Sequence, residues 1–150
     1  PLLAMSADAA PLWGPVLAAL KLGSGVVPTS TLLTVGDLQD RMIRGAIRHV
    51  VTDAEGAKKF ETIAGTYSRL VTSGTAAGWT RFADGYDASP HFVPDGETLA
   101  TEPVLLYCPS GTPASPKPVL HSQSSYPVGP PPTLYWTGPP AGGAPAGGGA

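Results

Sequence analysis

The sequence lacks asparagine, has a single cysteine, Cys108, and carries few charged side chains. Without asparagine there is no N-glycosylation acceptor, and one cysteine excludes an internal disulfide. Charged residues make up 13% of the chain, whereas globular proteins average about 25%. The net charge of −2 provides no overall field that would steer the chain toward nucleic acid or anionic lipid. Together with 42% hydrophobic residues, this low charge indicates that much of the surface lies against something other than water.

Long hydrophobic runs are also missing. The longest apolar stretches fall well short of the ~20 residues that a membrane-spanning helix needs, so we expect no membrane association. The 150 residues fit one domain. The chain begins at Pro1 rather than at Met, and we therefore expect a processed product or a piece of something longer.

Residues 34–73 have the clearest helical pattern. Their apolar residues recur at helical spacing, which predicts two helices in direct succession. Thr34 and Asp37 have the spacing of a capping box, and a second capping box begins at Thr52 with Glu55. The apolar stripe of the first helix consists of Leu38, Met42, Ile43, Ala46, Ile47, Val50 and Val51.

Two other parts complete the predicted body, residues 1–108. Residues 1–27 contain only two charged side chains, and their apolar spacing predicts a buried helix. Residues 79–108 contain two short strand candidates, Trp79–Ala83 and Val104–Cys108. We therefore expect an α+β fold in which the helical pair is central.

The last third of the chain has a different composition. Twelve of the eighteen prolines follow Ala100, and proline favours polyproline-like extension. We expect residues 109–138 to form an extended docking arm and residues 139–150 to form an Ala/Gly/Pro tail. The predicted docking residues, which a solvated linker would not use, are Leu120, Tyr126, Leu134, Tyr135 and Trp136.

Residues that suit chemistry have alternative explanations. Arg41, Arg44 and Arg48 would lie on one helix face and offer contacts to RNA phosphates, or simply form a solvated surface. Asp84, Asp87 and His91 lie within eight residues and provide carboxylate and imidazole ligands, but their spacing matches no closed zinc or calcium loop.

A thiol nucleophile and a peptide ligand are also possible. Cys108 has His91 and His121 as candidate bases, although a thiol in an apolar strand has a raised pKa and is inert. The segment Pro113–Pro116 fits the PxxP pattern of ligands for SH3 and WW modules. These patterns leave open a small hydrolytic or metal-dependent enzyme and a scaffold or adaptor protein.

The C-terminal residues 139–150, which contain only Ala, Gly and Pro, resemble the tail of victorivirus capsid proteins. Victoriviruses are totivirus-like fungal viruses with double-stranded RNA genomes. The resemblance implies a C-terminal portion of a capsid protein in an icosahedral shell, with no catalytic residue.

The resulting prediction is a structural protein of the virion. It would be a non-enzymatic oligomer that contacts copies of itself or other capsid chains, with possible RNA contact. It would need no metal or cofactor, and it would be found in virions and in the host cytoplasm.

Overall fold

A computed structural model describes residues 1–8, 10–94, 96–108 and 118–125. Its strands are β1 (Leu2–Ala4), β2 (Val26–Pro28), β3 (His49–Thr52), β4 (Ser68–Val71), β5 (Thr80–Arg81), β6 (Pro103–Tyr107) and β7 (Val119–Ser122). Its α-helices are α1 (Trp13–Lys21), α2 (Val35–Arg44) and α3 (Ala54–Lys59), and 3₁₀ helices occupy Ala10–Leu12 and Phe82–Asp87.

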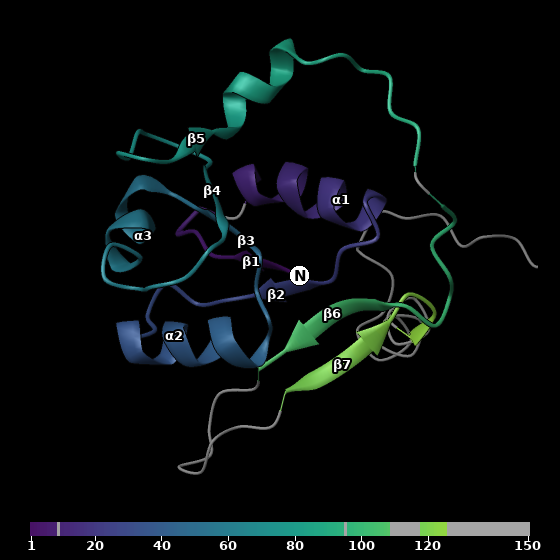
Figure 1. Cartoon of the computed structure of the whole chain (residues 1–150), viewed down its shortest axis with the longest axis horizontal. Coiled ribbons are helices and arrows are strands. Elements are labelled where there is room, and N and C mark those ends of the chain that lie inside the picture. Colours follow the sequence, from purple (N-terminus) through teal and green to yellow (C-terminus); the bar gives the residue numbers. More distant parts are fainter. Residues whose placement is uncertain (9, 95, 109–117, 126–150) are drawn as a thin grey trace, which may run out of the picture.

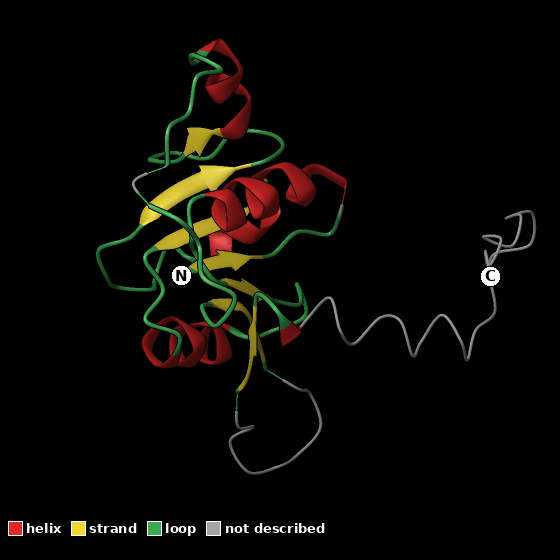
Figure 2. Ribbon diagram, turned by 90° about the vertical axis from the view of Figure 1, so that its right-hand side faces the viewer, coloured by secondary structure: helices red, strands yellow, loops and turns green. Residues whose placement is uncertain are grey.

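The strands form one sheet in the order β5-β4-β3-β1-β2-β6-β7. All neighbours pair in parallel except β6 and β7, which are antiparallel. Helix α1 lies on one face of the sheet, and α2 and α3 lie on the other (Figures 1 and 2). A mixed helix and strand fold is therefore confirmed, but the helical pair is not its centre.

The predicted helical pair is wrong because strand β3 separates its two helices. Helix α2 does begin at the predicted capping box, where the hydroxyl of Thr34 accepts a hydrogen bond from the N–H of Asp37. It ends at Arg44, after which Ala46 adopts a left-handed conformation with φ 46°. The chain then enters β3, whose Val50 and Val51 are both buried.

The second helix also differs from its prediction. Helix α3 has six residues, and its N-cap is Asp53 rather than Thr52, which is the last residue of β3. Where the sequence predicts the rest of this helix, the chain turns and then forms β4. Phe60 nevertheless remains fully buried against the sheet.

The N-terminal region contains two strands that the sequence did not predict, β1 and β2. These strands have three residues each, too few to show a period. Helix α1 lies between them as predicted, but it is not buried all round, because Trp13 is 64% exposed and Leu17 is 59% exposed.

The core has two parts because side chains alternate across a strand. Leu3 and Val50 point toward α2 and α3, whereas Ala4 and Val51 point toward α1. Each fully buried Leu or Val contributes about 1.5–3 kcal/mol relative to exposure to water. A core on both faces explains why the central strands read as continuous apolar runs.

The C-terminal part of the described chain ends the sheet. Strand β6 coincides with the predicted strand at Val104–Cys108, and β5 covers only two residues of the predicted Trp79–Ala83. Of the predicted arm, the structure describes residues 118–125, which include β7; the rest of the arm and the tail lie outside the described residues. In the described part of the chain, no helix is long and apolar enough to cross a membrane.

Candidate functional site

The sheet reverses its winding direction at β1. The chain moves from β1 to β2 on one side and then to β3 on the other, so the partial order is β2-β1-β3-β4-β5. In open parallel sheets, ligands bind beyond the carboxyl ends of the strands at such a switch point, because the flanking connections diverge there. We therefore expect a ligand site at the carboxyl edge of the sheet, next to β1 and β3.

Asp53 joins the connections that leave β1 and β3 at this point. Its Oδ2 accepts hydrogen bonds from the Ser6 hydroxyl at 2.9 Å and from the Ala7 N–H at 2.8 Å. Its Oδ1 accepts from the Gly56 N–H at 2.7 Å, which caps α3. Partial burial alone would raise the pKa of Asp53, but the hydrogen bonds from Ala7, Gly56 and Ser6 outweigh burial and lower it. Asp53 is therefore an ionised anchor at the switch point.

Lys59 fixes the neighbouring connection between β2 and α2. Its Nζ donates to the carbonyl oxygens of Thr31 at 2.6 Å and Leu33 at 2.9 Å. The bonds cross from the end of α3 to a segment more than twenty residues earlier. Two side chains thus hold three connections at the carboxyl edge.

The connection between β6 and β7 begins and ends at the same edge. Strand β6 is parallel to the central strands, and its last residue, Tyr107, pairs with Val119, the first residue of β7. The intervening residues 109–117, which lie outside the described residues, read Pro-Ser-Gly-Thr-Pro-Ala-Ser-Pro-Lys. Hydroxyls, glycine and lysine are the groups with which proteins bind phosphate.

Phosphate binding was not predicted for this segment, because its three prolines led to the interpretation of an extended arm. A signal was present, since Ser110-Gly111-Thr112 follows the strand candidate Val104–Cys108 after a single residue, Pro109.

An apolar cavity of about 350 Å³ lies between α1 and strands β1, β2 and β6. Eleven residues line it: Ala4, Leu12, Trp13, Val16, Leu20, Val26, Pro28, Thr29, Val104, Leu105 and Tyr107. None of them carries a charge. Thr29 and Tyr107 place the cavity next to the carboxyl ends of β2 and β6.

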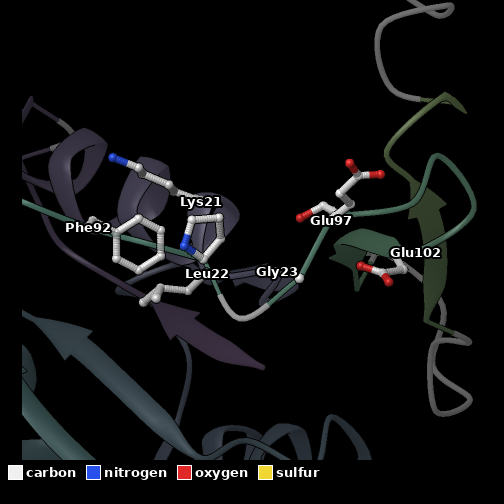
Figure 3. Close-up of a pocket in the computed structure, with 9 residues that line it drawn as sticks. Lys21, Leu22, Gly23, Phe92, Glu97 and Glu102 are labelled. Atoms are coloured by element: carbon white, nitrogen blue, oxygen red, sulfur yellow. The ribbon is translucent and has the colours of Figure 1, made fainter.

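A second pocket, of about 260 Å³, lies at the opposite edge of the sheet. Figure 3 shows Lys21 and Phe92 on one side of it and Glu97 and Glu102 on the other. The ammonium group of Lys21 lies 4.9 Å from the centre of the Phe92 ring. Its charged groups do not converge on one point, so this pocket lacks the organisation of the carboxyl edge.

The three predicted RNA-contact arginines do not share one helix face. Arg41 and Arg44 belong to α2, but Arg48 lies beyond its end. Within α2, Arg44 forms an ion pair with Asp40. No finding tests the RNA contact, which stays a prediction from the sequence.

The residues named for a metal or nucleophilic site are not assembled into one. Asp84 and Asp87 lie in the 3₁₀ helix Phe82–Asp87, where Asp84 pairs with Arg81 at 2.6 Å. His91 is exposed, and Cys108 is half-buried after β6. Among the described residues, no group of three or more His, Cys, Asp or Glu side chains is placed to hold a metal ion.

Of the predicted docking residues, the structure describes one. Leu120 lies on β7 and is 59% exposed. Tyr126, Leu134, Tyr135 and Trp136 lie outside the described residues, as does the PxxP segment.

Comparison with known proteins shows similarity to acyl-coenzyme A synthetases and ligases. The chain is 30% identical over 122 residues to mouse mitochondrial acyl-coenzyme A synthetase ACSM5 and 28% identical over 122 residues to the human protein. It is 29% identical over 119 residues to 4-hydroxybutyrate–CoA ligase 1 of Metallosphaera sedula. Each match covers 78% of this chain, which spans about a fifth of the relatives' length. No protein-family model matches the chain.

Solved structures of the same kind share the fold. A putative long-chain-fatty-acid CoA ligase from Rhodopseudomonas palustris superposes with a TM-score of 0.75, at 14% identity, over 90% of this chain and 34% of that one. The anthranilate CoA ligase AuaEII, in complex with anthranoyl-AMP, superposes with a TM-score of 0.71, at 20% identity, over 85% of this chain and 25% of that one.

These relatives overturn the capsid interpretation. The similarity extends over most of the chain, whereas the victorivirus resemblance rested on twelve residues of biased composition. The predictions of a non-enzymatic virion protein, of capsid partners and of a virion location are therefore wrong, because the relatives are enzymes and the human and mouse ones are mitochondrial. The alternative prediction, a small enzyme, agrees better with these relatives.

Proposed function

We propose that this chain forms the phosphate-binding part of an AMP-forming acyl-coenzyme A ligase. Such a ligase joins a carboxylate to the AMP part of ATP, with release of pyrophosphate, and then transfers the acyl group from this adenylate to the thiol of coenzyme A, with release of AMP. The observation that carries the proposal is the convergence of the switch point and the β6–β7 connection at one edge of the sheet. The similarity to CoA ligases over 78% of the chain supports it.

The residues of the β6–β7 connection have defined roles in this proposal. Ser110, Thr112 and Ser115 provide hydroxyl donors, and Lys117 provides a positive charge for the phosphate of the acyl adenylate. Gly111 permits close approach of the backbone. Pro109, Pro113 and Pro116 have no N–H, so side chains contribute a larger share of the donors than in a glycine-rich loop.

Asp53, which follows β3, supports this site from the other side of β1. Asp53 accepts all its described hydrogen bonds from protein groups, and its negative charge would repel a phosphate. We therefore assign it a positioning role: it holds the β1 connection in place while the phosphate lies toward β6.

A chain that spans about a fifth of its relatives provides part of a reaction site. We propose that it binds the adenylate phosphate and that the ligase reaction needs residues beyond this chain. The expected property of the chain is binding of a nucleotide monophosphate without turnover.

Titration of the chain with AMP, followed by calorimetry, tests this proposal. Lys117→Met removes the charge while keeping the length of the side chain, and we expect affinity to fall at least tenfold. The matched control is Lys58→Met, which removes an exposed lysine that pairs only with Glu55 among described groups. Equal affinity of the two variants, or no saturable binding by the unaltered chain, would refute the proposal.

Adenosine provides the second arm of the experiment. Because the proposed contacts are to phosphate, adenosine should bind more weakly than AMP, and the difference should shrink as salt is raised. Equal binding of adenosine and AMP would mean that the site recognises the nucleoside and that the phosphate assignment is wrong.

A further inference from the structure

A third pocket lies at the amino ends of β4 and β5, at the end of the sheet opposite β6 and β7 (Figure 1). Its volume of about 480 Å³ is within the range of ~300–1,000 Å³ typical of small-molecule sites. The lining contains one arginine, four residues with a hydroxyl group and no acid: Arg69, Thr66, Tyr67, Ser68 and Thr80. The pocket therefore offers positive charge and hydrogen-bond donors to an anion.

Arg69 is held in position at this pocket without an acid partner. The Cζ atom of Arg69 lies 4.8 Å from the centre of the Tyr67 ring, and its Nη2 donates to the Tyr67 hydroxyl at 3.3 Å. That hydroxyl donates in turn to the carbonyl oxygen of Ile63 at 3.0 Å, which fixes the ring. Among the described residues, no acid forms an ion pair with Arg69. A guanidinium group has five N–H donors, so Arg69 has donors and an uncompensated charge for a ligand.

The hydroxyl groups beside Arg69 are accessible. Thr66, Ser68 and Thr80 are all exposed. Among the described groups, none forms a hydrogen bond with the hydroxyl of Thr66 or Thr80. The Ser68 hydroxyl lies 2.8 Å from Nδ1 of His49, and a hydroxyl that accepts from an imidazole N–H can still donate to a ligand.

Two glycines leave space next to these groups. A Cβ at Gly65 would lie 3.4 Å from two atoms of the Tyr67 ring, so glycine leaves that part of the ring uncovered. Gly78 has a φ of 75°, in the left-handed region that favours glycine. Both residues line the pocket, and their lack of a side chain keeps it open beside the arginine.

We propose that this pocket binds the phosphate group of a small phosphate ester. Arg69 binds two phosphate oxygens through its planar fork, and the exposed hydroxyl groups bind the others. A phosphate has more acceptor oxygens than a carboxylate, so an arginine with several hydroxyls favours phosphate. Tyr67 and Leu70 provide apolar surface for the organic group of the ester. The site lies at the amino edge of the sheet, and it does not depend on the proposed adenylate site at the carboxyl edge.

Phenyl phosphate is the probe for this site. It is titrated into the whole ¹⁵N-labelled Lys117→Met chain, in which the proposed carboxyl-edge site lacks its cation, at an ionic strength held constant with chloride. The amide resonances of Ser68, Arg69 and Gly78 should shift and saturate. Phenol, which lacks the phosphate, should leave them in place. The absence of saturable shifts at these residues, or equal shifts with phenol, would overturn the proposal.

Phenylacetate tests the choice of phosphate over carboxylate. It carries the same ring with a planar carboxylate, which offers fewer oxygens to the hydroxyl groups. We expect it to bind at least tenfold more weakly than phenyl phosphate, since several hydrogen bonds to a charged group are lost. Equal affinity of the two compounds would mean that the pocket recognises a carboxylate and that the phosphate assignment is wrong.

Variants of Arg69 locate the binding. Arg69→Gln removes the charge and should weaken phenyl phosphate binding at least about tenfold. Arg69→Lys keeps the charge without the fork and should lose less. The matched control is Arg41→Gln, which removes an arginine of α2 outside the pocket and should bind normally. Equal affinity of Arg69→Gln and Arg41→Gln would overturn the proposal.

A hydroxyl variant decides if Arg69→Gln unfolds the chain. Thr80→Val replaces one exposed hydroxyl of the pocket with a methyl group. Because it removes a hydrogen bond to a charged group, binding should weaken about tenfold. Unchanged affinity in Thr80→Val would then overturn the proposal.

AMP titration of the same samples separates this site from the proposed adenylate site. If AMP still shifts the resonances of Ser6 and Tyr107 in Arg69→Gln, the carboxyl edge is intact and the loss of phenyl phosphate binding belongs to the amino edge. If phenyl phosphate binds as expected but AMP shifts neither Ser6 nor Tyr107 in the unaltered chain, the amino-edge site stands and the proposed function fails.

Discussion

Replacing Asp53 with alanine should destabilise the protein more than replacing any other single exposed or half-exposed acid of the described chain. The carboxylate accepts hydrogen bonds from Ser6, Ala7 and Gly56 at 2.7–2.9 Å. Loss of an N-cap typically costs about 1 kcal/mol. Each of the other two bonds contributes about 0.5–1.5 kcal/mol, and the lower half of that range applies because they are partly solvated. We expect a loss of about 2–3 kcal/mol.

Thermal and urea unfolding measure this loss. For a domain of this size, 1 kcal/mol corresponds to about 2–4 °C in melting temperature, so Asp53→Ala should melt about 5–10 °C lower. Asp53→Asn keeps an acceptor for Gly56 but places an amide group opposite Ser6 and Ala7, and it should show about half the loss. Asp87→Ala, an exposed acid outside the network, should stay within about 0.5 kcal/mol of the unaltered chain.

The pH dependence of stability provides an independent test of the role of Asp53. The pKa of Asp53 is lower in the folded protein than in the unfolded chain, whose aspartates titrate near ~3.9. Its stabilisation is therefore fully present above the unfolded pKa and lost as pH falls through the folded pKa. The stability difference between the unaltered chain and Asp53→Asn should shrink in acid. A difference that is constant with pH, or a loss below about 0.5 kcal/mol in Asp53→Ala, would refute the anchoring role.

Three further predictions follow from the same connections. Gly56→Ala would place a Cβ 1.9 Å from the Thr52 hydroxyl oxygen, so it should cost about 1–3 kcal/mol by overpacking, measured by urea unfolding. Thr52→Val should leave stability unchanged or raise it, because the Thr52 hydroxyl is buried without a hydrogen-bond partner among described groups; a large loss in a melting experiment would contradict this. Lys59→Met should lose about 1–3 kcal/mol, since two backbone carbonyls lose their donor, and hydrogen exchange should accelerate in the β2–α2 connection.

Matched controls exist for two of these variants. Gly85→Ala adds a methyl group that would meet no described atom within 4 Å apart from its chain neighbours and its own helix backbone, so it should be neutral. Lys58→Met removes an exposed ion pair with Glu55, which is worth at most about 1 kcal/mol. If Gly85→Ala lowers stability as much as Gly56→Ala, or Lys58→Met as much as Lys59→Met, the explanation from local contacts is wrong.

Helix α2 shows what the sequence could predict. Its N-cap at Thr34 depends on local hydrogen bonds with Asp37, and local chemistry is visible in sequence. Its end is not, because the residue in the left-handed conformation is Ala46 rather than glycine. The apolar spacing therefore predicted that the helix continues to Val50 and Val51.

Those two valines explain the main error in the fold. They point to opposite faces of the sheet, and both are buried. A short apolar run of this kind is compatible with a helix or with a fully buried strand, and periodicity cannot separate them. Strands β1 and β2 are shorter still, so their burial depends on tertiary contacts that the local sequence does not reveal.

The candidate site was not predicted because its parts are distant in the sequence. Asp53 and Ser6 lie 47 residues apart, and only the parallel order of β1 and β3 brings them together. The Ser-Gly-Thr run after β6 was visible, but its prolines favoured the interpretation of an arm.

Mapping of the bound ligand tests the central claim most directly. The whole ¹⁵N-labelled chain is titrated with a stable acyl-AMP analogue, and amide shift changes are assigned. The account predicts that the changed residues cluster at the carboxyl edge, around Ser6, Thr29 and Tyr107. Changes that cluster at the opposite edge, around Gly23 and Glu102, or a spectrum that does not change at all, would contradict it.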